Sequence, residues 1–176
     1  SFELVETETV INGSLKANRR GFSGNGKCYL SGPVTDSFYP STYSRDEFIW
    51  NLRYELLPGT YTFYYEDDLG RSEDGEFVIK QPVLNSLSQG VYSRDDRLIS
   101  INGDNLPLNM WSGNSYFKII DLNSNRVYDF YGKSNNIDLN ELYALWLVGR
   151  GEYEIYLELR GEKISNSLQF SFEDDW

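Results

Sequence analysis

The sequence predicts an all-β protein made of two tandem β-sandwich domains. Apolar and polar residues alternate in short runs, which is the pattern of a strand with one buried face. Clusters of Gly, Asn, Asp and Ser separate these runs and indicate turns. A strand–turn–strand pattern in the first half of the chain recurs in the second half, which indicates a repeated unit.

Three segments, 48–55, 61–65 and 153–159, show the alternation most clearly. Each places aromatic or apolar side chains on one face of a strand and mainly polar side chains on the other. Because the pattern repeats, we expect two separate cores. The first is expected to contain Trp50, Tyr61 and Phe63, and the second Ile101, Tyr153 and Ile155.

Segment 137–148 competes with the all-β reading. Asp138 followed by Glu141 has the spacing of a capping box and precedes an apolar run that includes Trp146. The segment is compatible with a single helical turn and is too poor in helical signals for a long helix.

The repeat pairs residues 57–79 with residues 148–172, and in both copies a strand, a polar turn and a final strand form a closing hairpin. The matched pairs are Gly59 with Gly151, Tyr61 with Tyr153, Gly70 with Gly161, and Phe77 with Phe170. Pro82 follows a completed strand, so we place the boundary after Lys80. The predicted domains are therefore 1–80 and 81–176, each the size of a β-sandwich domain.

The stretch GFSGNGKC, residues 21–28, resembles a phosphate-binding P-loop. That motif needs a buried strand before it, a helix after it and a final Ser or Thr for the metal ion. Here a basic, polar segment precedes it, Gly32 and Pro33 follow closely, and Cys28 replaces the hydroxyl residue. A glycine-rich turn between two strands is the better interpretation.

Composition excludes several function classes. The chain has no His, which removes the usual general base and the commonest transition-metal ligand. The net charge of −11 disfavours nucleic-acid binding, because a phosphate backbone requires a basic face. No apolar run has the length of a membrane-spanning helix. We expect no catalytic residues, no cofactor and no metal ion.

The turn and strand motifs resemble those of IPT/TIG immunoglobulin-like domains. The second half matches throughout, with PVLNSLSQGVYSRDDRLISINGDNL, RGEYEIYLEL and ISNSLQFSF; the first half contributes LPGTYTFYYEDDLGRSEDGEFVI. The first half matches only from Leu15 onward, because its opening strand lacks the usual proline. The resemblance implies two tandem immunoglobulin-like β-sandwiches, the second IPT/TIG-like, in a secreted or surface-exposed bacterial protein.

A second resemblance is to family-6-like carbohydrate-binding modules. Their opening pattern is similar to ETETV, residues 6–10, followed by GFSGNGK, residues 21–27. Such modules are longer than either repeat unit and end in a late aromatic-plus-Asn binding loop, so this resemblance stays an alternative.

Sugar binding is the first candidate function, because sugar rings stack on exposed aromatic side chains. Trp111 is the best candidate, since it lies in the loop PLNMWSGNS, where no strand alternation buries it. The other candidate ligand-binding residues are Asn109, Asn114, Tyr116, Tyr128 and Tyr131. The competing interpretation is that Trp111 closes the end of its own sandwich.

Other chemistry is less well supported by the sequence. Segment 66–76, EDDLGRSEDGE, gathers carboxylates that suit calcium, but its spacing is not that of a calcium loop, so a solvated turn is favoured. Paired carboxylates hydrolyse glycosides in other proteins, yet every pair here lies on a turn or an exposed strand face. Cys28 has no His partner, which favours a structural thiol.

The sequence therefore predicts a non-catalytic binding or spacer protein of the cell surface or the extracellular space, most simply part of a glycan-capture system. The resemblance implies the setting of a surface lipoprotein, with any outer-membrane anchor outside this chain. The expected partner is a polysaccharide or a surface protein. An adhesion or protein-interaction module without a carbohydrate ligand is the main alternative.

Overall fold

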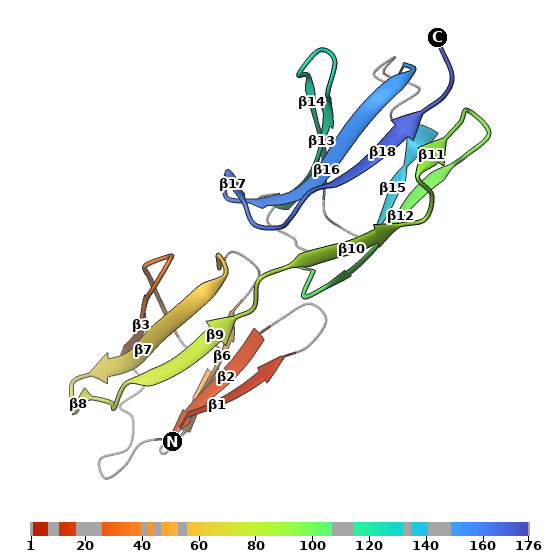
Figure 1. Ribbon diagram of the computed structural model, residues 1–176. Helices are drawn as coiled ribbons and strands as arrows, with labels where there is room; N and C mark the ends of the chain where they lie inside the picture. Colours follow the sequence, from red (N-terminus) through yellow and green to blue (C-terminus); the bar gives the residue numbers. More distant parts are fainter. Residues whose placement is uncertain are drawn as a thin grey trace. The chain divides into compact units, whose positions relative to one another are not determined.

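The computed structural model describes residues 2–6, 11–16, 26–39, 42–43, 47–52, 56–106, 115–131, 135–140 and 149–175 (Figure 1). Side chains are not described for residues 2–6, 11–16, 42–43, 47–52, 115 and 131. The described elements are β-strands, so the all-β prediction is confirmed. Contacts divide the chain into two compact units, Ser1–Lys80 (unit 1) and Gln81–Trp176 (unit 2).

Unit 1 has two antiparallel sheets. The first runs β1-β2-β6-β5, and the second runs β4-β3-β7, with β8 and β9 also pairing with β7. Their bounds are β1 Phe2–Glu6, β2 Ile11–Lys16, β3 Lys27–Ser31, β4 Asp36–Phe38, β5 Thr42–Tyr43, β6 Glu47–Leu52, β7 Gly59–Asp67, β8 Gly70–Arg71 and β9 Gly75–Ile79. With β1 as strand A and β9 as strand G, the sheets read A-B-E-D and C′-C-F-G, which is an immunoglobulin-type arrangement.

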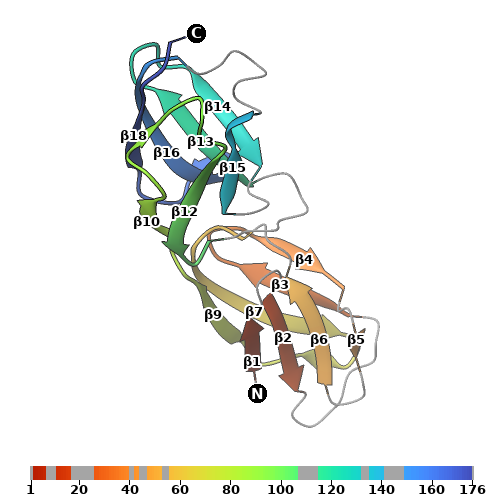
Figure 2. The ribbon, with the colours of Figure 1, turned by 90° about the vertical axis from the view of Figure 1, so that its right-hand side faces the viewer.

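Unit 2 repeats this plan with a change at its start, and among the described residues its first sheet has no strand that corresponds to β5 (Figure 2). Its sheets run β10-β12-β15 and β11-β18-β16-β13-β14, with β17 paired to β16. The bounds are β10 Val83–Leu87, β11 Val91–Tyr92, β12 Leu98–Asp104, β13 Ser115–Asp121, β14 Val127–Tyr131, β15 Asn136–Asp138, β16 Gly151–Leu159, β17 Glu162–Lys163 and β18 Leu168–Phe172. The opening segment is divided between the two sheets: β10 is antiparallel to β12, and β11 is parallel to β18.

The alternating segments form the central strand of each second sheet. On β7 the side chains of Tyr61, Phe63 and Tyr65 are at most 1% exposed, while Thr60 and Thr62 face solvent. On β16 every second residue from Tyr153 to Leu159 is buried. The predicted core residues of both units are therefore buried, except that the side chain of Trp50 lies outside the described residues.

A tyrosine near the start of each central strand forms a hydrogen bond with the backbone just before that strand. The Tyr61 hydroxyl donates to the Leu57 carbonyl at 2.6 Å, and the Tyr153 hydroxyl donates to the Gly149 carbonyl at 2.7 Å. Such a tyrosine corner at the start of strand F is characteristic of immunoglobulin-like sandwiches. The rings then stack on Phe77 and Phe170, with centroids 5.2 and 5.5 Å apart. The repeat read from the sequence thus extends to hydrogen bonds and ring packing.

The P-loop-like stretch, residues 21–28, ends in strand β3. Lys27 and Cys28 begin strand β3, where a P-loop requires a helix, so these residues do not form a P-loop. A Cβ on Gly26 would lie 2.4 Å from the Glu66 carbonyl oxygen, which explains that glycine by close packing. Residues 21–25 lie outside the described part of the chain.

The predicted capping box begins at the end of β15. The Asp138 carboxylate accepts a hydrogen bond from the Asn140 N–H at 2.9 Å, a contact of the N-cap type. Residues 141–148, which include Glu141 and Trp146, lie outside the described residues, so the predicted helical turn stays a prediction beyond Asn140.

Candidate functional site

The outer face of unit 2, defined here by Tyr116, Lys118, Asp129, Tyr156 and Glu158, brings charged and aromatic side chains together from three strands. Strand β13 buries Phe117 and Ile119, so the side chains between them point to the other side of the sheet. The register places Lys118 opposite Asp129 of β14 and opposite Tyr156 of β16. Tyr116 lies opposite Glu158.

Lys118 is the centre of this face. Its Nζ lies 2.6 Å from Asp129 Oδ1, 3.4 Å from Glu158 Oε1 and 5.1 Å from the centroid of the Tyr116 ring. Its side chain is only 14% exposed. Burial acts to lower the pKa of Lys118, but the hydrogen bond and charge of Asp129, together with Glu158, outweigh it and raise the pKa above its usual value. The amine therefore stays cationic and orders its neighbours.

The raised pKa predicts a difference in stability at alkaline pH. Because the folded pKa of Lys118 lies above the unfolded value, its stabilisation is complete below the unfolded pKa and is lost as pH rises through the folded pKa. We expect the free energy of unfolding of the wild type to exceed that of Lys118→Met by about 1 kcal/mol near neutral pH. This difference should close above about pH 10.5. Urea unfolding of both proteins across this range measures the gap. A constant gap would contradict the ionic role.

Each unit carries a rung, defined here as a cation of the short hairpin strand lying on a tyrosine of the central strand. In unit 1 the Arg71 guanidinium of β8 lies 3.6 Å from the Tyr64 ring centroid. In unit 2 the Lys163 ammonium of β17 lies 4.9 Å from the Tyr156 ring centroid. Tyr64 also stacks on Tyr29 of β3, with centroids 5.1 Å apart. Cation–π contacts at exposed sites contribute about 0.5–1 kcal/mol, so they favour these side-chain orientations.

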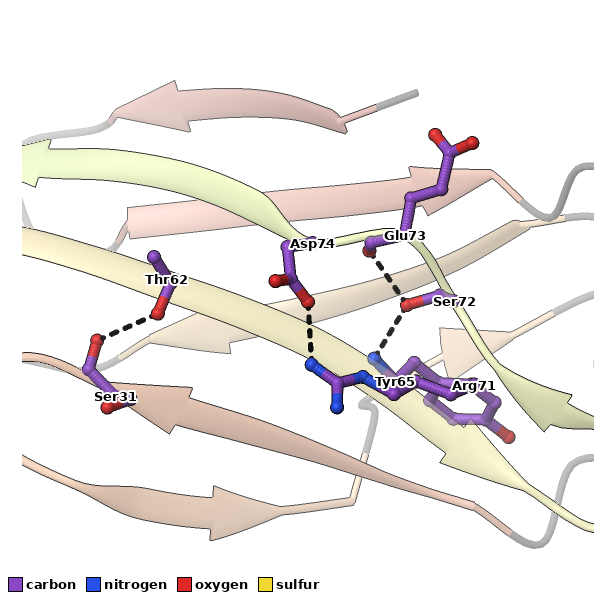
Figure 3. Close-up of polar contacts among 7 residues, drawn as sticks. All are labelled: Ser31, Thr62, Tyr65, Arg71, Ser72, Glu73 and Asp74. Carbon is purple, nitrogen blue, oxygen red and sulfur yellow. Dashed lines mark hydrogen bonds and ion pairs between the residues drawn. The ribbon is translucent and has the colours of Figure 1, made fainter.

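Polar contacts within the acidic hairpin of unit 1 hold its shape, and Figure 3 shows those of Arg71, Ser72 and Asp74. Asp74 pairs with Arg71 at 2.9 Å, and Asp67 accepts from the Leu69 N–H at 2.8 Å. The Ser72 hydroxyl accepts from the Tyr65 N–H at 2.8 Å and donates to the Glu73 carbonyl at 3.0 Å. These contacts fit the interpretation of a solvated turn better than that of a calcium loop.

The structure places three of the predicted sugar-binding residues. Tyr116 is half-buried on β13 and lies directly opposite Tyr131 of β14, whose side chain is not described. Tyr128 lies opposite Ile119, and its side chain, 9% exposed, faces the core of unit 2. Asn109, Trp111 and Asn114 lie outside the described residues. The register thus brings Tyr116 and Tyr131 together and leaves Tyr128 on the other side of the sheet.

The described residues offer little reactive chemistry. Cys28 is fully buried, and burial raises the pKa of its thiol far above the usual value, as expected for a structural thiol. Among the described residues, no three carboxylate or Cys side chains are grouped so as to hold a metal ion. No helix in the described part of the chain is long and apolar enough to cross a membrane.

Sequence reasoning missed Lys118, Arg71 and Lys163, which the structure shows in these clusters. The rungs were detectable, because Tyr64 and Tyr156 hold equivalent places in the repeated hairpin and a cation follows each. A further signal lies before strands β3 and β13. Phe22-Ser-Gly-Asn25 begins six residues before Cys28, and Trp111-Ser-Gly-Asn114 begins six residues before Phe117. Cys28 and Phe117 hold equivalent places, paired with Tyr65 and Leu157, so the sequence segment around Trp111 also has a counterpart in the first half.

No protein-family model matches the chain, and no curated protein matches it. Among solved structures, a two-domain fibronectin type-III segment of chicken tenascin is similar, with 13% identity, a TM-score of 0.36, and 98% of this chain and 97% of that chain covered. The adhesin domain of Epf from Streptococcus pyogenes has 10% identity, a TM-score of 0.35, and coverage of 99% and 80%. The BSP domain of a biofilm-associated protein has 16% identity, a TM-score of 0.28, and coverage of 94% and 27%.

These scores are too low to assign a family or a function. The sheet orders and the two tyrosine corners nevertheless define the chain as two immunoglobulin-like β-sandwich units.

Proposed function

We propose that the chain is a non-catalytic binding module of a cell-surface or secreted protein and that it contacts a protein partner through its outer sheet faces. The repeated rungs, Arg71 on Tyr64 and Lys163 on Tyr156, are the observation that supports this role. Tyr and Arg supply much of the binding energy of protein interfaces. Side chains that are already ordered lose less conformational entropy when a partner binds.

The absence of His and the burial of the single thiol support a role without catalysis. The IPT/TIG resemblance of residues 81–176, and the extracellular or surface location that it implies, are part of the same proposal. We accordingly propose an immunoglobulin-like domain over residues 1–80 and an IPT/TIG-like domain over residues 81–176.

Binding of the immobilised chain to a panel of extracellular matrix proteins and polysaccharides tests this role. We expect at least one protein of the panel to bind, and the double variant Arg71→Ala, Lys163→Ala to weaken that binding at least about tenfold. Both side chains are about half exposed, so the variant should keep its fold. Leu122→Ser, at an exposed turn, is the matched control and should bind like wild type. A double variant with unchanged affinity would contradict a role for the rungs.

Glycan capture is the second candidate. The observation that favours it is the cross-strand pair of Tyr116 and Tyr131, next in sequence to the segment that contains Asn109, Trp111 and Asn114. Aromatic rings in such a position stack on sugar rings, and amides bind their hydroxyl groups.

Affinity electrophoresis against a polysaccharide panel tests the glycan hypothesis. If it is correct, a polysaccharide retards the wild-type chain, and Trp111→Ala abolishes the retardation while the circular dichroism spectrum stays unchanged. Trp176→Ala serves as the control. Migration unaffected by every polysaccharide would exclude glycan capture and leave the protein-binding role.

A further inference from the structure

The two units differ at the outer edge of their last strand. In unit 2 that edge, β18, is covered by β11, which runs parallel to it and pairs Val91 with Ser171 and Tyr92 with Phe172. The Ser171 N–H donates to the Gly90 carbonyl at 2.9 Å, and the Glu173 N–H donates to the Tyr92 carbonyl at 2.9 Å. The outward backbone groups of β18 are therefore used within the unit.

Strand β9 is the counterpart of β18 in unit 1, and the register proves the equivalence residue by residue. Tyr61 pairs with Phe77 as Tyr153 pairs with Phe170, and Gly59 pairs with Ile79 as Gly151 pairs with Phe172. Ser171 and Glu173 therefore correspond to Val78 and Lys80. Because hydrogen-bonding direction alternates along a strand, the N–H groups of Val78 and Lys80 point away from β7.

Within the described part of unit 1, no strand is hydrogen-bonded to this edge; strand β1 lies close to β9 but pairs with β2. Strand β9 pairs with β7 alone, and no hydrogen bond from Val78 or Lys80 to another described group is present outside that pairing. The connection that supplies β11 in unit 2 spans Ser88–Arg97, between β10 and β12. Strands β1 and β2 are instead paired as far as Glu6 and Ile11, and only residues 7–10 separate them. The Val78 side chain is 48% exposed.

We propose that the outer edge of β9 is an acceptor slot for an extended segment of a partner protein, which adds to the sheet parallel to β9 as β11 adds to β18. The proposal rests on the protein-binding role proposed above and adds the edge of β9 to the outer sheet faces as a second contact surface. An uncovered strand edge presents unpaired N–H and C=O groups that pair readily with an added strand. Strand addition of this kind is a common mode of peptide recognition.

Unit 2 indicates the chemistry of the occupant. Its own occupant is the run Gly90-Val91-Tyr92, in which Tyr92 is fully buried and contacts Phe170 edge to face, with centroids 5.6 Å apart. The Tyr92 hydroxyl also forms a hydrogen bond with the Ser88 hydroxyl at 2.9 Å and accepts one from the Gln89 N–H at 3.0 Å. The partner segment is therefore expected to be extended and uncharged, with a large aromatic side chain one position after a β-branched residue.

Amide hydrogen exchange of the full chain, followed residue by residue by NMR, tests the slot directly. In the free chain we expect the Val78 and Lys80 amides to exchange at least tenfold faster than those of Ser171 and Glu173. Adding a synthetic peptide of sequence SQGVYS, residues 88–93, should slow exchange at Val78 and Lys80 at least threefold, with saturation. Ser171 and Glu173 should not change, because their own β11 is tethered beside them. The peptide SQGVSS is the matched control and should have no effect.

Two variants complete the test. Val78→Pro removes only an outward N–H, so it should leave the unfolding midpoint of unit 1 near that of wild type and abolish the peptide effect at Lys80. Ser171→Pro removes the N–H that donates to the Gly90 carbonyl, so it should lower the unfolding midpoint of unit 2. The proposed slot would be overturned if the Val78 amide exchanged slowly in the free chain, or if the peptide SQGVYS did not slow exchange at Val78 and Lys80. A protein partner that binds Val78→Pro as tightly as wild type would also overturn it while leaving the proposed function standing.

Discussion

Phe63→Ala is expected to lower the free energy of unfolding of unit 1 by about 3–5 kcal/mol. Phe63 is fully buried at the middle of β7, between the buried side chains of Tyr61 and Tyr65. Truncation removes its transfer energy and leaves a cavity that the surrounding strands fill only in part. Since the stability of a small domain is about 5–15 kcal/mol, this loss is a large fraction of the total.

Urea unfolding followed by hydrogen-exchange mass spectrometry separates the two units. Phe63→Ala should shift the transition of peptides from residues 1–80 and leave peptides from residues 81–176 unchanged. Ile155→Ala, at the equivalent place on β16, should give the reverse pattern with a loss of about 2–5 kcal/mol. Thr60→Ala, on the exposed side of β7, is the control and should stay within about 0.5 kcal/mol. An equal shift in both halves would contradict two separate cores.

The fold was predictable from local patterns because its central strands alternate strictly. Tyr61, Phe63 and Tyr65 are buried as the period of two requires, and so are Tyr153 and Ile155. The closing hairpins were also readable, since each depends on a turn and on residues close to it in sequence. These features arise from neighbouring residues, and a single sequence is sufficient to detect them.

Features that depend on strand pairing were not predictable. Lys118 meets Asp129 and Glu158 only because β13 pairs in one register with β14 and in another with β16. A shift of either register by one residue would move these side chains to the opposite face. The parallel pairing of β11 with β18 is equally invisible in the sequence, because Val91 and Ser171 are far apart along the chain.

The candidate sugar-binding residues also separate what the sequence predicts from what strand pairing decides. The sequence identified Tyr116, Tyr128 and Tyr131 by residue type and proximity to the Trp111 loop. Cross-strand pairing then places Tyr116 opposite Tyr131, while strand alternation directs Tyr128 into the core. Residue type thus indicates which side chains suit a ligand, and pairing decides which of them share a surface.

The tyrosine corners give the second large effect. Tyr61→Phe removes the hydroxyl that donates to the Leu57 carbonyl, and we expect a loss of about 1–3 kcal/mol, because a buried carbonyl is left without its partner. Tyr153→Phe should cost more, since the Tyr153 hydroxyl both donates to the Gly149 carbonyl at 2.7 Å and accepts from the Gly149 N–H at 3.1 Å. Burial raises the pKa of Tyr153 above its usual value, so its hydroxyl loses the proton only at a more alkaline pH than an exposed tyrosine does.

Tyr64→Phe is the matched control for both corner variants. Tyr64 lies on the same strand as Tyr61, but it faces the outer side, where its ring stacks on Tyr29 and Arg71 and its hydroxyl has no hydrogen bond among the described contacts. Its replacement should change the free energy of unfolding by less than about 0.5 kcal/mol. Urea unfolding measures all three variants, and the expected order of loss is Tyr153→Phe, then Tyr61→Phe, then Tyr64→Phe. Equal losses for Tyr61→Phe and Tyr64→Phe would mean that the ring alone, without its hydroxyl, holds the start of β7 in place.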